Sequence, residues 1–198
     1  MKSKKWTLIL TSLTALTLMT ACGQSTTKSS TTAAADTTAI TTSAKNSQSS
    51  YFTEKDYDTS YDESTASKIE LSGSSANVSG DGVTVSGSTV TISKAGTYVI
   101  FGQSDGVQIK IAADKSDDVK LVLKGATMTN TDAAISATSA GHVYLTLAEG
   151  TTNSLSDSSS NSDEKANAAL FSKVDLTING SGTLNVDGNK SNAIKAND

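Results

Sequence analysis

Short runs in which apolar and polar residues alternate dominate the chain from residue 83 onward. Examples are residues 83–85, 90–92 and 109–111, each bounded by Gly, Ser, Asn or Asp. Alternation at every second position between turn-forming residues is typical of β-strands that bury one face. The pattern therefore predicts an all-β domain. By itself it fits both an antiparallel sandwich and a repeating solenoid.

An internal repeat decides between these two alternatives, because a period near two dozen residues is typical of solenoids. Three segments begin with Val-x-Leu-x-(Leu or Ile), at Val119, Val143 and Val174. The first two starts are 24 residues apart and the last two are 31 apart, with the extra residues in the polar stretch SSSNSDEKA. A second set of apolar positions recurs after the copies begin: Ile135, Leu170 and Ile194. We therefore predict a parallel β-helix whose strands stack about 4.8 Å apart.

Alternation within the copies also predicts which side chains line the core of this solenoid. Two stacks are expected: Leu121, Leu145 and Leu176 in the first, and Leu123, Leu147 and Ile178 in the second. Asn130 is expected to form hydrogen bonds inside the fold, because a buried amide needs partners. The chain stops at NAIKAND, where another Val-x-Leu strand should follow. We therefore expect the β-helix to be truncated at its C-terminus.

The ordered set of motifs resembles a known family. The run SGDGVTVSGSTVTISKAGTYVIFGQSDG is followed by DDVKLVLKGATMTN, LAEGTTNSLSD and DLTINGSGTLNVDGN. Over residues 52–198 the chain is similar to the carbohydrate-binding, polysaccharide-lyase-like β-helix lipoproteins of Firmicutes. The resemblance implies a right-handed parallel β-helix that binds cellulose or acidic plant polysaccharides such as polygalacturonate. It also implies bound calcium, without demonstrated lyase activity.

The first 22 residues resemble a bacterial lipoprotein signal peptide. Lysines precede an apolar stretch that is too short to span a membrane, and LMTACG resembles a lipobox that ends at the chain's only cysteine, Cys22. We expect Cys22 to carry lipid, with a simple secretory signal as the alternative. Residues 23–50 are rich in Ser, Thr and Ala and are expected to form a disordered tether. The carbohydrate-binding domain, residues 51–198, would then lie on the extracellular face of the cytoplasmic membrane of a Gram-positive bacterium.

Charge and composition narrow the classes of partner. The 198 residues carry a net charge of -4 and the lysines are scattered after the N-terminus, so the basic patch of a nucleic-acid-binding protein is missing. We expect a monomer whose partner is a polysaccharide. The lead-in to the domain is acidic and is expected to be a solvated N-terminal cap. Its acidic residues are Glu54, Asp56, Asp58, Asp62 and Glu63.

Each copy of the repeat has an aspartate seven residues after its glycine: Asp132, Asp157 and Asp187. If the copies are in register, these carboxylates lie roughly 5 Å apart and repel one another unless a cation binds between them. Calcium prefers oxygen ligands of this kind, and Asp163 with Glu164 in the polar insertion offers a second set. We therefore predict Ca2+ as a cofactor. The alternative is that each aspartate is present only as a turn former.

Bound calcium would connect the domain to a substrate class, because it can bridge protein carboxylates to the carboxylates of uronate sugars. Neutral glucans would instead need an exposed aromatic ring. Tyr144 is the candidate for such a ring, since it alternates with residues that are expected to face inward. We predict that Tyr144 contributes to substrate binding.

A polysaccharide lyase of the pectate type is the first alternative function. Its reaction needs a base near calcium, and Lys173 and Lys195 occupy related places after the second apolar set. The chain has no arginine to hold a uronate in a bidentate pair. His142 has no carboxylate or cysteine partner at motif spacing and is expected to be a surface turn residue. A structural adhesin with a protein partner is the second alternative.

Overall fold

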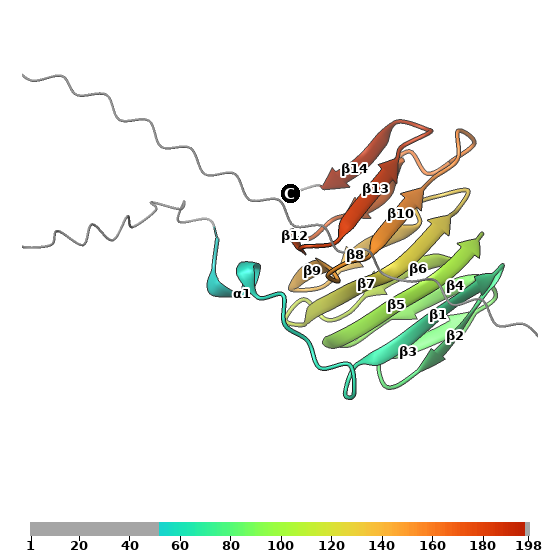
Figure 1. Ribbon diagram of the computed structural model, residues 1–198. Coiled ribbons are helices and arrows are strands. Elements are labelled where there is room, and N and C mark those ends of the chain that lie inside the picture. The colour runs from blue at the N-terminus through green and yellow to red at the C-terminus, as the bar shows by residue number, and fades with distance from the viewer. Residues whose placement is uncertain (1–51, 197–198) are drawn as a thin grey trace, which may run out of the picture. The chain divides into compact units, whose positions relative to one another are not determined.

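The computed structural model describes residues 52–196, which form one short helix and 14 strands (Figure 1). In chain order the elements are α1 (Glu54–Tyr57), β1 (Ser67–Gly73), β2 (Ser75–Ser79), β3 (Val83–Ser86), β4 (Thr89–Ile92), β5 (Gly96–Asp105), β6 (Gln108–Ala112), β7 (Asp118–Thr129), β8 (Ile135–Ser139), β9 (His142–Leu147), β10 (Thr152–Ser156), β11 (Ala168–Ser172), β12 (Leu176–Gly180), β13 (Thr183–Asp187) and β14 (Asn192–Ala196). The all-β class predicted from the alternating pattern is confirmed. Within the described range, no helix has the length and apolar character needed to cross a membrane.

The strands form two mixed sheets. Sheet A has eight strands, in the order β12-β9-β7-β5-β1-β2, with β10 pairing both β7 and β13. Sheet B has six strands, in the order β14-β11-β8-β6-β4-β3. The β1/β2 and β3/β4 pairs are antiparallel, and the other pairs of the two sheets are parallel.

The predicted right-handed parallel β-helix is therefore wrong. The strands between residues 52 and 196 form two mixed sheets and no closed solenoid. Both antiparallel pairs are hairpins with a Gly-Ser loop, where φ is 60° at Gly73 and 59° at Gly87. Glycine at the first position of a two-residue turn adopts this positive φ without strain and reverses the chain. The repeat begins only at Val119 and carries no information about these two hairpins.

The second apolar set of the repeat lies in register as predicted. Leu170 of β11 pairs with Ile135 of β8 on one side and with Ile194 of β14 on the other. Ile135 is the first residue of β8, and Leu170 and Ile194 are the third residues of β11 and β14. The recurrence of these apolar positions in the sequence therefore identified residues that are neighbours in the sheet. This part of the repeat therefore does predict the parallel order β14-β11-β8 within sheet B.

The third Val-x-Leu copy is shifted by two residues. Val143 of β9 pairs with Val119 of β7, but on its other side it pairs with Leu176 rather than Val174. Ile178, not Leu176, consequently lies beside Leu145. A slip of one residue would move every side chain to the opposite face, whereas a slip of two keeps each on its own face. Alternation alone therefore could not detect the shift.

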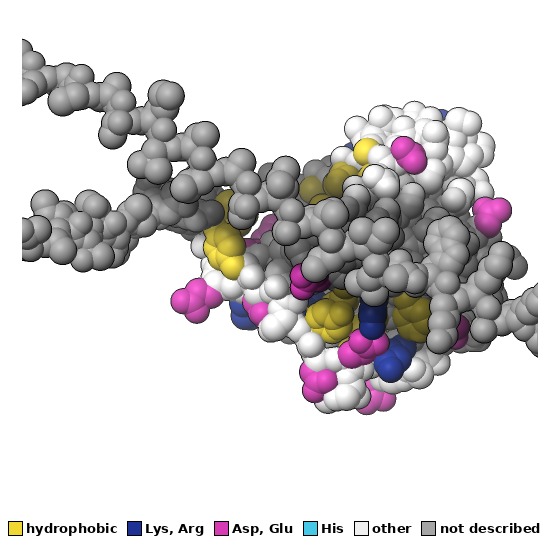
Figure 2. All heavy atoms as spheres, in the orientation of Figure 1, with side chains coloured by type: hydrophobic (Ala, Val, Ile, Leu, Met, Phe, Trp, Pro, Cys, Tyr) yellow, Lys and Arg dark blue, Asp and Glu magenta, His cyan; other side chains and the backbone are white. Residues whose placement is uncertain are grey.

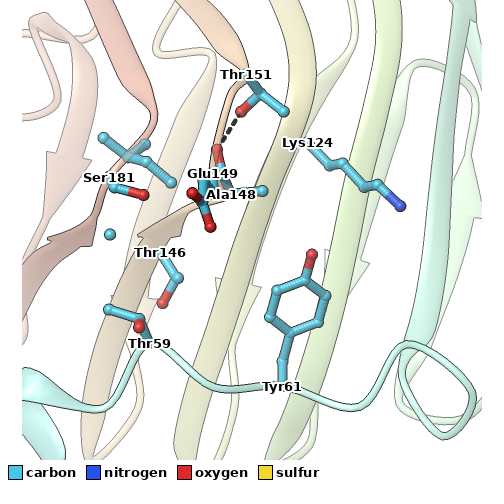
Figure 3. A pocket seen from close by; sticks show the side chains of 10 residues that line it. Thr59, Tyr61, Lys124, Thr146, Ala148, Glu149, Thr151 and Ser181 are labelled. Atoms are coloured by element: carbon cyan, nitrogen blue, oxygen red, sulfur yellow. Dashed lines mark hydrogen bonds between the residues drawn. The ribbon is translucent and has the colours of Figure 1, made fainter.

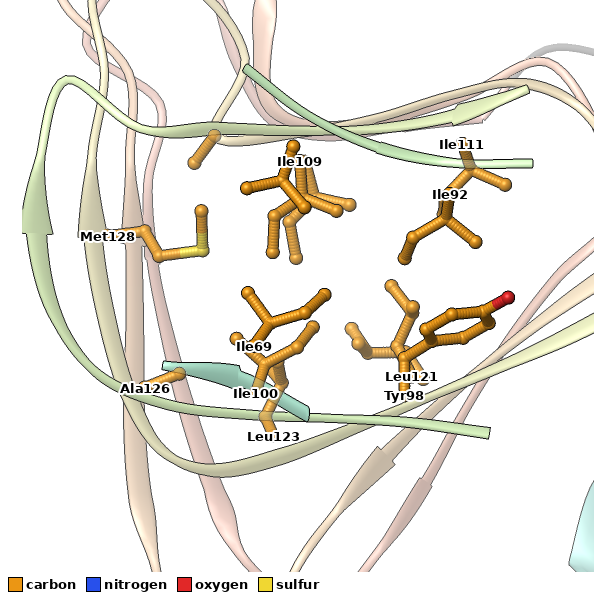
Figure 4. Packing of buried hydrophobic residues seen from close by; sticks show 14 of the residues in the cluster. Ile69, Ile92, Tyr98, Ile100, Ile109, Ile111, Leu121, Leu123, Ala126 and Met128 are labelled. Atoms are coloured by element: carbon orange, nitrogen blue, oxygen red, sulfur yellow. The ribbon is translucent and has the colours of Figure 1, made fainter. Parts of the chain in front are cut away.

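The hydrophobic core lies between the two sheets. In Figure 4, isoleucines of sheet B face isoleucines, leucines and Tyr98 of sheet A across this space. Full burial of each such side chain stabilises the fold by about 1.5–3 kcal/mol. The largest fully buried side chains include Ile69, Ile92, Tyr98, Ile100, Ile109, Ile111, Leu121 and Leu123.

Asn130 satisfies its amide as predicted. It is 9% exposed, donates from Nδ2 to the carbonyl of Gly106 at 2.7 Å, and accepts at Oδ1 from the backbone N–H of Asp132 at 2.9 Å. The bond to Gly106 joins the end of β7 to the loop after β5, and the bond from Asp132 fixes the turn after β7. A buried amide that lost them would cost about 1–3 kcal/mol.

Residues 52–66, here called the lead-in, lie against the outer face of sheet A. Tyr61 and Ala66 pack on a small apolar cluster of that face: Val99, Val122 and Ala148. No residue of the lead-in belongs to a strand, so side chains rather than a backbone ladder attach it to the sheet. Figure 3 shows the lead-in crossing the strands at Thr59 and Tyr61. This crossing creates the concave surface that carries the candidate site.

Candidate functional site

A hollow of about 340 Å³ lies where the lead-in crosses the outer face of sheet A (Figure 3). Its size is at the lower end of the range for small-ligand pockets. The lead-in, β7, β9, the turn after β9 and the end of β12 all contribute to it. The lining residues are Thr59, Tyr61, Lys124, Thr146, Leu147, Ala148, Glu149, Thr151, Gly180 and Ser181.

The lining combines one aromatic ring with several hydroxyl groups and a carboxylate. Tyr61 is half-buried and presents its ring beside the strands, while Glu149 is exposed at the turn after β9. Thr151 donates a hydrogen bond to the carbonyl of Ala148 at 2.7 Å, which fixes this turn. An aromatic face suits the apolar face of a sugar ring, and hydroxyl and carboxylate oxygens suit its hydroxyls. The hollow thus offers the two kinds of contact that sugar recognition needs.

Gly180 allows β12 to pack closely against β9 at the edge of the hollow. Its φ is 95°, and a Cβ at this position would clash with the backbone carbonyl of Leu147 on the neighbouring strand. A side chain there would have to push β12 away from β9, because the obstruction is backbone rather than a flexible side chain. Gly180, the glycine of the third repeat copy, is therefore needed for the close packing of β12 on β9.

Two polar atoms beneath the lead-in have no hydrogen-bond partner. They are Oγ1 of Thr146, which is 1% exposed, and Oδ1 of Asn179. Asn179 pairs with Thr146 across β12 and β9, and adjacent strands lie about 4.8 Å apart. The amide orientation of Asn179 is fixed, because its Nδ2 donates to the carbonyls of Asp56 and Asp58. A buried donor or acceptor without a partner costs roughly 1–3 kcal/mol, so this pair weakens the attachment of the lead-in to the sheet.

Two lysines of β7 bind carboxylates of the lead-in. Lys120 Nζ lies 3.1 Å from Asp58 Oδ2 and also donates to the carbonyl of Ser60 at 2.8 Å, and Lys124 Nζ lies 2.7 Å from Glu63 Oε2. Hydrogen bonds from Ser60 and then from Lys120 lower the pKa of Asp58 to about 2. The bond to Lys124 lowers the pKa of Glu63, and the same bond raises the pKa of Lys124. In Figure 2, acidic and basic side chains accordingly lie next to one another on the lower part of the described surface.

The expectation that the lead-in acids form a solvated cap is wrong for Asp56, which is 7% exposed. Asp58 and Glu63 stay about half exposed while they bind sheet lysines. The sequence does contain a signal for these ion pairs, because acidic residues recur in the lead-in and the two lysines Lys120 and Lys124 share one face of a strand. The sequence alone did not indicate that these segments, about 60 residues apart, would meet.

Asp56 is the centre of a buried polar cluster. Its carboxylate accepts hydrogen bonds from the hydroxyl of Thr177 and from the backbone N–H and hydroxyl of Thr53. These bonds, that of Thr177 first, hold its pKa at about 2. His142 Nε2 lies 2.9 Å from Thr177 Oγ1 and 3.7 Å from Asp56 Oδ1. His142 is thus not a surface turn residue but the half-buried first residue of β9 with a carboxylate neighbour.

Tyr144 does face away from the core, yet it is covered. Its ring stacks on His142 at a centroid distance of 4.1 Å, and the residue is only 7% exposed. It borders a second hollow of about 260 Å³ together with Lys55, Asp118 and Lys120. Burial, followed by the nearby charge of Asp118, raises the pKa of its phenol. The role of Tyr144 in substrate binding stays a prediction, and Tyr61 is the aromatic residue that lines the larger hollow.

The three repeat aspartates do not occupy equivalent places. Asp187 pairs with Ser156, one residue before Asp157, and Ser156 pairs with Thr129, three residues before Asp132. Equal spacing from the repeat glycine does not place the three aspartates side by side, because the number of residues between the glycine and the end of the following strand differs from copy to copy. Between residues 52 and 196 there is no group of three or more Asp, Glu, His or Cys side chains placed to hold a metal ion.

Hydrogen bonds further distinguish the predicted calcium ligands. Asp157 is 1% exposed, and its carboxylate accepts from the backbone N–H of Asn189 at 2.6 Å and from Nδ2 of Asn161 at 3.2 Å. Asp163 accepts two backbone N–H groups of its own turn. Carboxylates that accept N–H donors serve the fold and have little capacity left for a cation. The set as a whole does not fit a calcium site, although Oδ1 of Asp132 is buried without a partner.

The two candidate bases and the remaining acid lie away from the large hollow. Lys173 is exposed after β11, and Lys195 on β14 donates to the carbonyl of Lys165 and to Oδ1 of Asn167, both at 2.9 Å. Glu164 is exposed in the polar insertion. None of these residues lines the hollow described above. Cys22 and the signal-peptide and tether predictions lie outside the described residues.

Comparison with known proteins gives three findings. A family model described as carbohydrate-binding domain-containing protein matches residues 86–198. A carbohydrate-binding domain-containing protein of Acetivibrio thermocellus is 37% identical over 108 residues, which cover 52% of this chain and 38% of that protein. A solved structure of the polysaccharide lyase-like protein from C. thermocellum, a gadolinium derivative, matches with a TM-score of 0.63 and 36% identity over 66% of this chain and 56% of that one. The chain therefore spans less than two thirds of each relative.

Proposed function

The chain belongs to the family of carbohydrate-binding domain-containing proteins, and on this premise we propose that it binds polysaccharide without cleaving it. The proposed binding site is the hollow between the lead-in and the outer face of sheet A. The observation that carries this assignment is the lining itself, in which the ring of Tyr61 lies opposite the hydroxyls of Thr151 and Ser181 and the carboxylate of Glu149. Ring stacking provides affinity, and the oxygens orient the sugar by hydrogen bonds.

The lining supports binding rather than cleavage. Glycoside hydrolysis needs two carboxyl groups across the scissile bond, and Glu149 is the one acid among the residues that line this hollow. Elimination from a uronate needs a base close to the bound sugar. Lys124 is the one lysine in the lining, and its ammonium is held by Glu63, which raises its pKa and keeps it protonated. A protonated lysine cannot accept the proton.

A surface location is part of the same proposal. The lysine-rich start, the short apolar stretch and the lipobox-like LMTACG support a lipid anchor on Cys22. An anchored chain with residues 23–50 as a tether would hold the binding domain outside the cytoplasmic membrane. Mass spectrometry of the mature N-terminus from the native host tests this part, because an unmodified Cys22 in the mature protein would exclude the anchor.

Substitution of Tyr61 tests the proposed site. Tyr61→Ala is expected to weaken binding to insoluble polysaccharide by about tenfold, because it removes the stacking surface. Tyr57→Ala is the matched control, since Tyr57 belongs to the same lead-in, is 53% exposed and lies outside the hollow. Pull-down on cellulose and polygalacturonate measures both variants. Equal binding by the two variants would exclude the hollow as the binding site.

A further inference from the structure

His142, the first residue of β9, is joined to the lead-in by a short chain of hydrogen bonds. We propose that His142 is a positioning residue: a second proton on its imidazole fastens the lead-in to sheet A, and loss of that proton at higher pH loosens it. The lead-in carries Thr59 and Tyr61 into the hollow, so the same proton would regulate ligand binding there. This effect on binding rests on the proposed function, whereas the control of the lead-in does not.

The hydrogen atoms of this chain can be assigned from its donors and acceptors. With a pKa of about 2, Asp56 is a carboxylate that can only accept, so the hydroxyl hydrogen of Thr177 points to it. The Thr177 oxygen must therefore accept at its second contact, 2.9 Å from Nε2 of His142, and Nε2 must carry a hydrogen. The other ring nitrogen, Nδ1, has no hydrogen-bond partner among residues 52–196, and the side chain is 22% exposed. Nδ1 can therefore take a proton from water without breaking the chain of hydrogen bonds.

The charges around the ring favour this second proton. Nε2 of His142 lies 3.7 Å from Oδ1 of Asp56, whose side chain is 7% exposed, so water screens the pair weakly. Sheet A adds the carboxylate of Asp118, the register partner of His142 in β7, and Asp175 directly precedes β12 on the other side. The lysine of α1, Lys55, lies 2.9 Å from Asp118, which compensates its charge.

Docking of the lead-in changes these surroundings in one direction. Asp118, Asp175 and Tyr144 belong to sheet A or its edge, so they stay near the imidazole whether or not the lead-in is in place. Tyr144 stacks on the ring at 4.1 Å and remains neutral, because burial raises the pKa of its phenol. The lead-in carries five acidic residues and one lysine, and it places Asp56 against the ring. Docking therefore strengthens the binding of a proton, and by linkage the proton strengthens docking.

The direction of the pH effect follows from this linkage. The docked lead-in favours the protonated ring, so the added attachment is present at mildly acidic pH and is lost as pH rises and the ring releases its proton. Histidine side chains change charge between about pH 5 and pH 8. This range lies well above the one in which Asp56 titrates, and the effect has the opposite sign.

Hydrogen exchange of the full chain tests the proposal, and the chain has a single histidine. Protection of residues 53–61 is compared at about pH 6 and pH 8, after correction for the intrinsic pH dependence of exchange. We expect about three- to tenfold greater protection at pH 6. His142→Gln keeps an N–H donor for Thr177 and does not titrate, so its protection should be equal at the two pH values. Equal protection of the native chain at both, or the same ratio in His142→Gln, would overturn the proposal.

Asp56→Asn is a second variant that keeps the histidine and removes the carboxylate. We expect it to reduce the ratio of protection between pH 6 and pH 8 to less than about twofold. A ratio as large as in the native chain would assign the effect to another group and contradict the proposal. Nitrogen chemical shifts of His142 at pH 8 test the assigned hydrogen directly. The Nε2–H tautomer supports the proposal, and the Nδ1–H tautomer would contradict it.

Binding to insoluble cellulose distinguishes failure of this proposal from failure of the proposed function, because the charge of cellulose does not change with pH. We expect the native chain to bind about two- to fivefold more tightly at pH 6 than at pH 8, and His142→Gln to bind equally at both. Native binding that is the same at the two pH values would overturn the regulation of the site. If cellulose is bound at neither pH, the proposed function fails, while the exchange ratio still decides whether His142 controls the lead-in.

Discussion

The carboxylate of Asp56 in the short helix α1 accepts a hydrogen bond from the hydroxyl of Thr177 in β12, 121 residues later in the chain. This bond attaches the start of the lead-in to the edge of sheet A, and Asn179 strengthens it by donating to the carbonyl of Asp56 at 3.0 Å. The bond matters for function because the lead-in carries Tyr61 over the hollow. Its loss should therefore affect the site as well as stability.

Thr177→Val is expected to loosen the lead-in without unfolding the sheets. The substitution keeps the shape of the side chain and removes a hydrogen bond to a buried carboxylate, which contributes about 1.5–3 kcal/mol. Hydrogen exchange should accelerate at residues 53–61 and stay slow in β5 and β7. Thr84→Val on the exposed face of β3 is the control, and equal acceleration in both variants would contradict the assignment.

The attachment of the lead-in is expected to depend on pH. The pKa of Asp56 is about 2 in the folded protein, below its ordinary value of 3.8. A group whose pKa is lower in the folded state stabilises that state above the unfolded pKa, and the contribution is lost as pH falls through the folded pKa. Protection of the lead-in from hydrogen exchange should therefore decrease between about pH 4 and pH 2.

Asp56→Asn provides the control for this pH dependence. The amide does not titrate, so the variant should start with lower protection and show a flatter response over the same pH range. Other lead-in carboxylates also have lowered pKa values, among them Asp58 and Asp62. An identical pH response in the native chain and in Asp56→Asn would assign the effect to those groups instead.

Asn153 is expected to be essential for the stability of the irregular part of β7 at Gly125 and Ala126. It is fully buried, and its Oδ1 accepts from the backbone N–H groups of both Gly125 and Ala126 at 2.9 Å. Asn153→Leu leaves both N–H groups buried without a partner, at a cost of about 1–3 kcal/mol each. Thermal unfolding should show a clear decrease in Tm, whereas Asn185→Leu at an exposed position of β13 should change it little.

Asp157 is expected to act in folding rather than in calcium binding. Its carboxylate joins the end of β10 to Asn161 and to the backbone at Asn189. Asp157→Asn should lower the free energy of unfolding by about 1.5–3 kcal/mol, by the same amount in calcium and in chelator. The exposed Asp187→Asn is the control. If Asp157→Asn destabilises the protein only when calcium is present, Asp157 is a calcium ligand and this prediction is wrong.

Local patterns in the sequence predicted much of the strand content but not the arrangement of the whole. Alternation identified the strands, and the recurrence of Ile135, Leu170 and Ile194 identified real neighbours. The Gly-Ser loops at residues 73–74 and 87–88 are typical hairpin signals, and the repeat, which begins at Val119, does not reach them. A two-residue shift of the third copy left no trace, since it preserves which face each side chain occupies.

The candidate site was harder to predict because the lead-in completes it. Periodicity has no information on where an irregular segment lies, and ion pairs such as Lys124 to Glu63 join residues 61 positions apart. Tyr144 alternates with core residues, which predicts that it faces outward, and it does. The lead-in then covers it, which alternation could not reveal. Tyr61 belongs to the lead-in, where no alternating or repeating pattern identifies it as a residue of the site.

Hydrogen exchange of the full chain with and without bound polysaccharide tests most directly whether the lead-in face of sheet A is the binding surface. We predict slower exchange on binding at residues 59–63 and 146–151, which border the hollow, and no change in β6 and β8 of sheet B. Protection confined to sheet B, with residues 59–63 and 146–151 unaffected, would contradict the account.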